Sequence, residues 1–166
     1  MAPGPRDSYL FAALKTRENW IAMAATVAVT AAVVAYSRTP LPAEVTVDLT
    51  RMQRFGSLVH ATPVGFWPDR SGAMTTGDVA RVVLNRPLPG RFELVIEGRA
   101  LDAGGAVDAE VRVGASSYAA RFETDTAPIT LRIDNDAGAR EIVLRLPAGS
   151  RLAVTRITTR ALGGPA

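Results

Sequence analysis

Apolar residues fill one uninterrupted segment near the N-terminus, from Trp20 to Tyr36. Its 17 residues include no charge, proline or glycine. A helix of this length rises ~25 Å, close to the ~30 Å of a membrane's hydrocarbon core. Trp20 and Tyr36 lie at the two ends, where amphipathic rings favour the membrane interface. The pattern predicts a single transmembrane helix at residues 20–36, after a short cytoplasmic segment at residues 1–19.

Two other structures are compatible with an apolar run of this kind. A buried helix of a soluble protein would normally show a polar stripe, and only Thr26 and Thr30 are polar here. A cleaved signal peptide is the stronger alternative, because Val33-Val34-Ala35 offers a small-residue cleavage site. The preceding stretch is long and contains Asp7 and Glu18, unlike a short basic signal region. A retained anchor is therefore the favoured interpretation.

The charges that flank the apolar segment predict its orientation. Arg6, Lys15 and Arg17 precede it, whereas Arg38 alone follows it closely. Basic residues are enriched on the cytoplasmic side of a membrane, so the N-terminus is expected inside. The expected location is the bacterial inner membrane, with the C-terminal part periplasmic or extracellular. The bilayer is then the first predicted partner.

One face of the predicted helix carries small residues. Ala24, Ala28 and Ala32 recur every four residues. Small side chains let helix backbones approach closely in lipid, so this face is a candidate surface for packing against a partner helix. The alternative is that alanine is simply abundant in this chain.

From residue 37 onward the pattern changes from continuous apolarity to alternation. Pro40 and Pro42 end the helix and indicate a linker at residues 37–43. Val45, Val47 and Leu49 then alternate with polar residues, which is the period of a half-buried strand. Seven further strand candidates lie at residues 79–86, 91–101, 107–113, 117–123, 129–134, 140–146 and 151–162.

These strand candidates are joined by short connections. Turn sequences occupy Pro87–Gly90, Asp102–Gly105 and Asn135–Gly138. The gaps are too short for the crossover helices that a parallel sheet requires. We therefore expect an all-β, antiparallel β-sandwich of about eight strands at residues 44–162, with a short tail at residues 163–166. Residues 51–78 are expected to be irregular.

Composition excludes several functions and supplies no catalytic motif. The chain has no cysteine, and a net charge of +3 without basic blocks gives no nucleic-acid surface. His60 is the only histidine, and a structural role is favoured for it. Asp134–Gly138 is rich in oxygen ligands, but it lacks the later ligands of a calcium loop, so a turn is favoured over a calcium site. We expect no enzyme activity, no metal and no cofactor.

The most unusual local sequence is Phe66-Trp67-Pro68-Asp69-Arg70. In an extended segment Phe66 and Trp67 point to opposite sides, so one ring can close the end of the sandwich while the other stays available. Asp69 and Arg70 can offer an acceptor and a planar donor beside the ring. Trp67, Asp69, Arg70 and Phe66 are therefore the candidate residues for binding a glycan or a partner protein. The alternative is that both rings only fill the core.

Three short motifs carry a family resemblance. Phe66-Trp67-x-Asp, the segment Asn85–Phe92, and Val111-x-Val113-Gly114 followed by Phe122 together resemble the small jelly-roll modules attached to bacterial membrane glycosyltransferases and phosphoglycerol transferases. The likeness covers about residues 65–162. The glycine-rich segment expected before the tryptophan is replaced here by Ala61–Val64. The resemblance implies a jelly-roll-like fold and an accessory module that contacts glycan or a partner enzyme.

Three functions follow from these features. The favoured hypothesis is a non-catalytic, membrane-anchored accessory subunit, whose β-sandwich binds glycan or a partner membrane protein that assembles glycan, such as a glycosyltransferase. The alternative is a structural subunit of an envelope complex, docked through the alanine face and without a sugar site. A hydrolase is the least favoured of the three.

Overall fold

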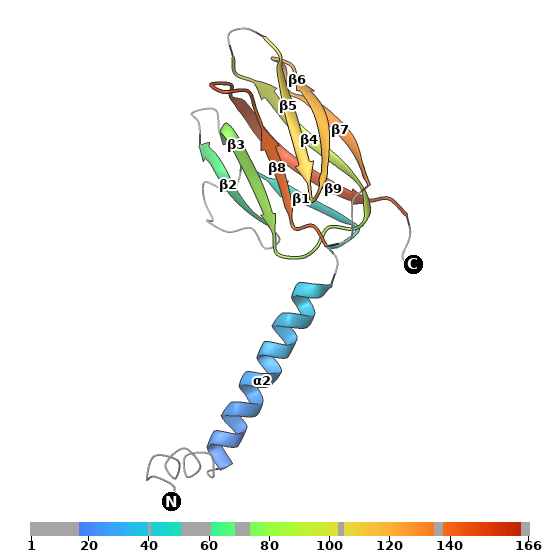
Figure 1. Ribbon diagram of the computed structural model, residues 1–166. Coiled ribbons are helices and arrows are strands. Elements are labelled where there is room, and N and C mark those ends of the chain that lie inside the picture. Colours follow the sequence, from blue (N-terminus) through green and yellow to red (C-terminus); the bar gives the residue numbers. More distant parts are fainter. Residues whose placement is uncertain are drawn as a thin grey trace, which may run out of the picture. The chain divides into compact units, whose positions relative to one another are not determined.

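The structure is a computed structural model that describes residues 17–39, 41–50, 61–68, 74–102, 105–134 and 138–163. The chain divides into two compact units, and their boundary in the sequence lies between Arg38 and Thr39. The first unit contains the helix α2 (Arg17–Arg38), and the second contains the β-strands (Figure 1).

Helix α2 is 22 residues long and extends the predicted span at both ends. Asn19–Arg38 is long and apolar enough to cross a membrane, a property that signal sequences share. Two of its hydroxyl groups bond within the helix: the Thr26 hydroxyl donates to the carbonyl of Ala22 at 2.9 Å, and the Ser37 hydroxyl donates to that of Val34 at 2.9 Å. These bonds lower the cost of placing hydroxyl groups in lipid.

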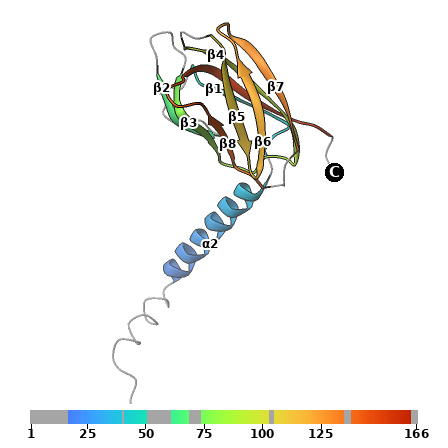
Figure 2. The same ribbon diagram turned by 45° about the horizontal axis from the view of Figure 1, so that its top comes forward.

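Nine strands are present in the described part of the chain, and all their pairings are antiparallel. Five strands form sheet I in the order β2-β3-β8-β5-β6, and four form sheet II in the order β1-β9-β4-β7. Their bounds are β1 (Glu44–Asp48), β2 (Ala61–Pro68), β3 (Met74–Leu84), β4 (Arg91–Ala100), β5 (Val107–Val113), β6 (Ser116–Phe122), β7 (Ala127–Asp134), β8 (Glu141–Arg145) and β9 (Leu152–Ala161). The two sheets pack as the layers of an antiparallel β-sandwich (Figure 2). The predicted fold class is confirmed.

A single hydrophobic core lies between the two sheets. Along β4 the buried residues are Phe92, Leu94 and Ile96, which alternate with more exposed ones. Phe122 of β6 is also fully buried, so the inner faces of both sheets meet around aromatic rings. Each such side chain contributes roughly 1.5–3 kcal/mol when it leaves water. This burial selects the register of every strand.

The prediction of an irregular stretch at residues 51–78 is wrong in part. It contains β2 and the beginning of β3, which pair with each other from Ala61↔Leu84 to Pro68↔Met74. The start of β3 also pairs with β9, through Met74↔Val154 and Thr75↔Ala153, and this short ladder links the two sheets. Prolines and a glycine interrupt the alternation of β2, so a strand was not expected there.

On the opposite side of the sandwich, a tyrosine links the edges of the two sheets. The Tyr118 hydroxyl on β6 donates to the carbonyl of Asp134 on β7 at 2.9 Å. The same hydroxyl accepts the N–H of Asp134 at 3.1 Å. One side chain thus pairs with both main-chain groups of one residue, as a neighbouring strand would. Figures 1 and 2 show β6 and β7 side by side.

Replacing this hydroxyl should weaken the sandwich without altering its shape. We expect Tyr118→Phe to lower the free energy of unfolding by about 1 kcal/mol, because both main-chain bonds are lost at a partly exposed position. Urea denaturation would measure the change. Ser117→Ala is the control on the same strand, since its hydroxyl bonds only the exposed Glu110. An equal loss in both variants would contradict a special role for Tyr118.

Candidate functional site

A β-bulge between strands β2 and β3, at Gly65 of β2, sets the direction of the two aromatic side chains. The pairing of β2 with β3 shifts register between Val64 and Phe66. Gly65, between them, has a φ of 77°, in the left-handed region. A Cβ on Gly65 would lie 2.6 Å from the carbonyl oxygen of Val79, so only glycine fits this close approach. Between the pairs Val64↔Arg81 and Phe66↔Thr76, β2 has only Gly65 whereas β3 has residues 77–80, so the strands lose register there and the alternation of β2 shifts at Gly65.

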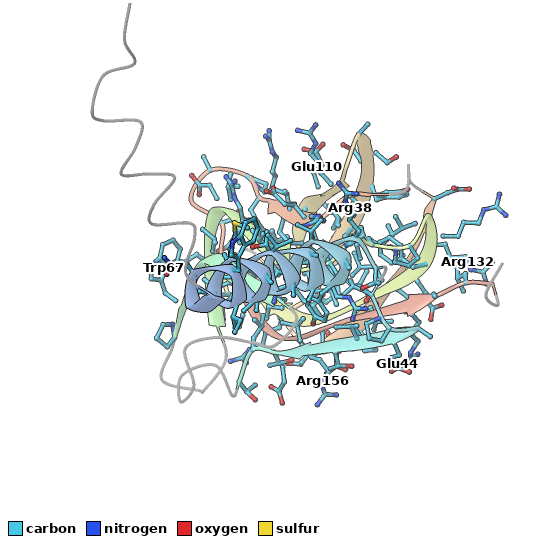
Figure 3. All side chains as sticks on the ribbon, turned by 90° about the horizontal axis from the view of Figure 1, so that it is seen from below. Arg38, Glu44, Trp67, Glu110, Arg132 and Arg156 are labelled. Atoms are coloured by element: carbon cyan, nitrogen blue, oxygen red, sulfur yellow. The ribbon has the colours of Figure 1, made fainter. Side chains whose placement is uncertain are left out.

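The bulge turns Phe66 inward and Trp67 outward. Without it, Trp67 would share the side of Ala61, which is fully buried. Phe66 instead packs partly buried against the core, whereas Trp67 is 57% exposed. Figure 3 shows Trp67 projecting from one side of the sandwich. An indole ring thus lies at the surface in a fixed strand, not in a loose loop.

The Trp67 ring lies against the backbone of Gly77 on the neighbouring strand β3. A Cβ on Gly77 would be 3.1 Å from Cζ3 and 3.3 Å from Cη2 of the indole. Glycine therefore leaves the space that the ring occupies. This contact supports one side of the ring and leaves more than half of the side chain to solvent. Such a ring can stack on a sugar or on a side chain of a partner.

Trp67 shares the outer face of sheet I with valines and arginines. Across this face, Val64 of β2 pairs with Arg81, Arg81 with Val143, and Val143 with Arg112. The next row holds Val79, Arg145 and Glu110 in register. Val64 and Val79 are 48% and 44% exposed. The sheet therefore brings together, from strands distant in sequence, an exposed surface that is apolar and basic.

The outer face of sheet II differs in its charges. Glu44, Asp48, Glu97, Arg156 and Arg160 line a shallow groove of 450 Å³ there, together with threonines and Val95. Its charged groups pair with each other: Arg156 Nη1 lies 3.2 Å from Glu97 Oε1, and Arg160 Nε lies 3.3 Å from Glu44 Oε1. In Figure 3, Glu44 and Arg156 project from the face opposite to Glu110. This surface is hydrophilic, and both of its arginines are paired with carboxylates.

The structure does not describe several of the predicted positions. Asp69 and Arg70 lie outside the described residues, so their placement beside Trp67 stays a prediction. His60 and the middle of the Asp134–Gly138 turn also lie outside them. Ala24, Ala28 and Ala32 are exposed on α2, and their role in helix packing stays a prediction. Within the described ranges, no three His, Cys, Asp or Glu residues gather to hold a metal.

Two parts of this site were not expected from the sequence. The support of Trp67 by Gly77 depends on the pairing of two strands, one of which was not predicted. The basic cluster of Arg81, Arg112 and Arg145, from two adjacent rows, comes from three strands that sequence spacing does not connect. The sequence did contain a signal for the contact between Trp67 and Gly77, because an isolated glycine in a strand-like run often marks a bulge or a close backbone approach.

Two glycine substitutions test the importance of the bulge. Gly65 and Gly149 both have a positive φ, 77° and 82°, but a Cβ on Gly149 would meet nothing within 4 Å. We expect Gly149→Ala to cost about 1–2 kcal/mol from backbone conformation alone. Gly65→Ala should cost roughly 2 kcal/mol more, because its Cβ would overlap the Val79 carbonyl. Thermal unfolding of both variants measures this difference, and equal losses would contradict it.

Part of the chain is similar in sequence to a known protein. A segment of 96 residues, 58% of the chain, is 34% identical to phosphoglycerol transferase I of Citrobacter koseri. The matched segment spans 12% of that protein's length. This match agrees with the resemblance to modules of phosphoglycerol transferases that the sequence motifs indicate.

Solved structures of similar fold share little sequence with the chain. A CBM36-1 domain of a xylanase from the hindgut metagenome of Trinervitermes trinervoides is 11% identical, with a TM-score of 0.49, over 73% of this chain and 99% of that one. A carbohydrate-binding module CBM36 in complex with calcium and xylotriose is 13% identical, with a TM-score of 0.46, over 69% and 98%.

One family covers most of the chain. Residues 51–163 match the family described as "Domain of unknown function (DUF7024)". This range includes strands β2 to β9, and therefore the whole of sheet I with the Trp67 face. The chain belongs to the DUF7024 family.

Proposed function

We propose that this chain is a non-catalytic, membrane-anchored accessory subunit. In this role α2 stays in the bacterial inner membrane with its N-terminus inside, and the β-sandwich lies in the periplasm. There the sandwich binds glycan, or a membrane enzyme that assembles glycan. The similarity to a phosphoglycerol transferase over a small part of that enzyme supports a role next to such an enzyme.

One observation carries the binding part of this proposal: the exposed indole of Trp67, supported by Gly77. Burying an aromatic ring of this size would stabilise the fold, yet 57% of the side chain remains in solvent. Its strand position reduces the entropy lost when a ligand binds. The valines and arginines around it add apolar contact and hydrogen-bond donors. A ring with such neighbours suits stacking on a sugar or on a partner side chain.

The variant Trp67→Ala should separate binding from stability. We expect it to lower the free energy of unfolding by about 1–2 kcal/mol, because less than half of the side chain is buried. Phe66→Ala should cost roughly 2–4 kcal/mol, because that ring packs against the core. Binding to glycan, or recovery of partner proteins after solubilisation in detergent, should fall in Trp67→Ala and largely persist in Trp67→Phe.

Two results would contradict this assignment. If Trp67→Ala unfolds the protein as strongly as Phe66→Ala, then Trp67 is part of the core. If Trp67→Ala binds glycan and recovers partners as the unmodified chain does, then the ring is not the binding surface. A structural subunit that docks through the alanine face of α2 would then be favoured.

The anchor is tested separately by membrane fractionation. We expect the full-length chain to stay with the membrane after extraction at alkaline pH, because Asn19–Arg38 can span the bilayer. Its N-terminal sequence should begin ahead of α2. A soluble exported protein whose N-terminus lies near Tyr36 would instead identify the segment as a cleaved signal peptide.

A further inference from the structure

A groove of 410 Å³ lies on the outer face of sheet I, beside the strand ends of β5 and β8. Its lining includes side chains from both strands and two glycines at its rim. The lining residues are Arg112, Gly114, Gly138, Ala139, Arg140, Glu141, Val143 and Arg145. Three arginines and one glutamate give this lining a formal charge of +2.

Strand register explains why the arginines converge. Arg112 of β5 lies directly opposite Val143 of β8, and Arg81 of β3 lies opposite Val143 on its other side. Arg145 follows two residues after Val143, so it projects from the same face. Neighbouring strands are ~4.8 Å apart, and therefore long guanidinium side chains from β3, β8 and β5 can reach a common point above Val143.

The carboxylate of Glu110 neutralises Arg112 only weakly. Arg112 Nε lies 3.9 Å from Glu110 Oε1, longer than the 2.7–2.9 Å of a strong charged hydrogen bond. The same carboxylate oxygen already accepts a bond of 2.7 Å from the Ser117 hydroxyl. The groove on sheet II has the opposite character: three carboxylates and two arginines give a charge of −1, and contacts of 3.2 and 3.3 Å pair its arginines.

We propose that the sheet I groove binds a phosphate group, with Arg112 and Arg145 as its main ligands. Guanidinium groups donate two parallel hydrogen bonds to phosphate, and they remain charged at any physiological pH. A phosphate monoester offers three non-bridging oxygens and the diester of a lipid headgroup offers two, so either can accept bonds from two arginines at once. The phosphate is carried by a soluble molecule or by a lipid headgroup.

The rim of the groove leaves room for the rest of such a molecule. Gly138 has a φ of 116°, and a Cβ there would meet nothing within 4 Å. The half-buried Val143 forms an apolar floor next to the arginines. This site goes beyond the proposed role of Trp67 and does not depend on it, because Trp67 is not among the residues that line the groove.

Titration of the full-length, ¹⁵N-labelled chain in non-ionic detergent tests the proposal. The soluble probes are inorganic phosphate and glycerol phosphate, with glycerol as the uncharged control at matched ionic strength. We expect the side-chain Nε–H signals of Arg112 and Arg145 to shift and saturate with both phosphates. Arg112→Gln and Arg145→Gln should each raise the Kd about tenfold. Arg132→Gln is the matched control, because Arg132 is an exposed arginine of β7 in sheet II and does not line the groove on sheet I.

A second experiment, in lipid nanodiscs, distinguishes a soluble phosphate from a lipid headgroup. The chain is reconstituted in nanodiscs of phosphatidylcholine alone, or of equal parts phosphatidylcholine and phosphatidylglycerol. A response to soluble glycerol phosphate supports the site with a soluble ligand, and a response only to phosphatidylglycerol supports it with a lipid headgroup. The proposal is overturned if neither titration gives a saturable shift. It is also overturned if Arg132→Gln loses binding as strongly as Arg112→Gln and Arg145→Gln. Trp67→Ala should leave phosphate binding unchanged, so failure of the glycan proposal is seen independently.

Discussion

The two sheets depend on a shared apolar interior that neither could keep from water alone. Phe92, Leu94 and Ile96 on β4 need the inner face of sheet I, just as Phe122 needs that of sheet II. This requirement fixes which side of each strand faces inward, and so it determines the composition of the outer faces. The sandwich is linked along one side by the β3–β9 ladder and along the other by the Tyr118 hydroxyl.

The two outer faces have acquired different properties. On sheet II, arginines and carboxylates lie in pairs at about hydrogen-bond distance, so their charges act mainly on each other. On sheet I, arginines alternate with valines, and an indole stands at the end of the face. The paired charges of sheet II suit a surface that stays in contact with water. The apolar and basic face of sheet I suits binding to a ligand or partner. The proposed functions of the protein both lie on sheet I for this reason.

The sequence allowed the fold class to be predicted because most strands show simple alternation. Val107–Val113 and Arg91–Ala100 were recognisable in this way, and their bounds differ little from those expected. Strand β2 was missed because the bulge at Gly65 breaks its period, although that bulge is what brings Trp67 to the surface. The arginine groove could not be predicted, since it requires the register between β3, β8 and β5. That register results from packing across the whole core, not from any local motif.

The contact between Trp67 and Gly77 has a consequence for how this protein can change during evolution. The indole occupies the volume where a side chain of residue 77 would begin. A larger residue at position 77 therefore displaces the ring, and a smaller residue at position 67 removes the reason for a glycine. The two positions are coupled through space. Once Trp67 is replaced by a smaller residue, its ring no longer requires glycine at position 77. A DUF7024 protein that has lost both would have kept the sandwich while giving up this surface.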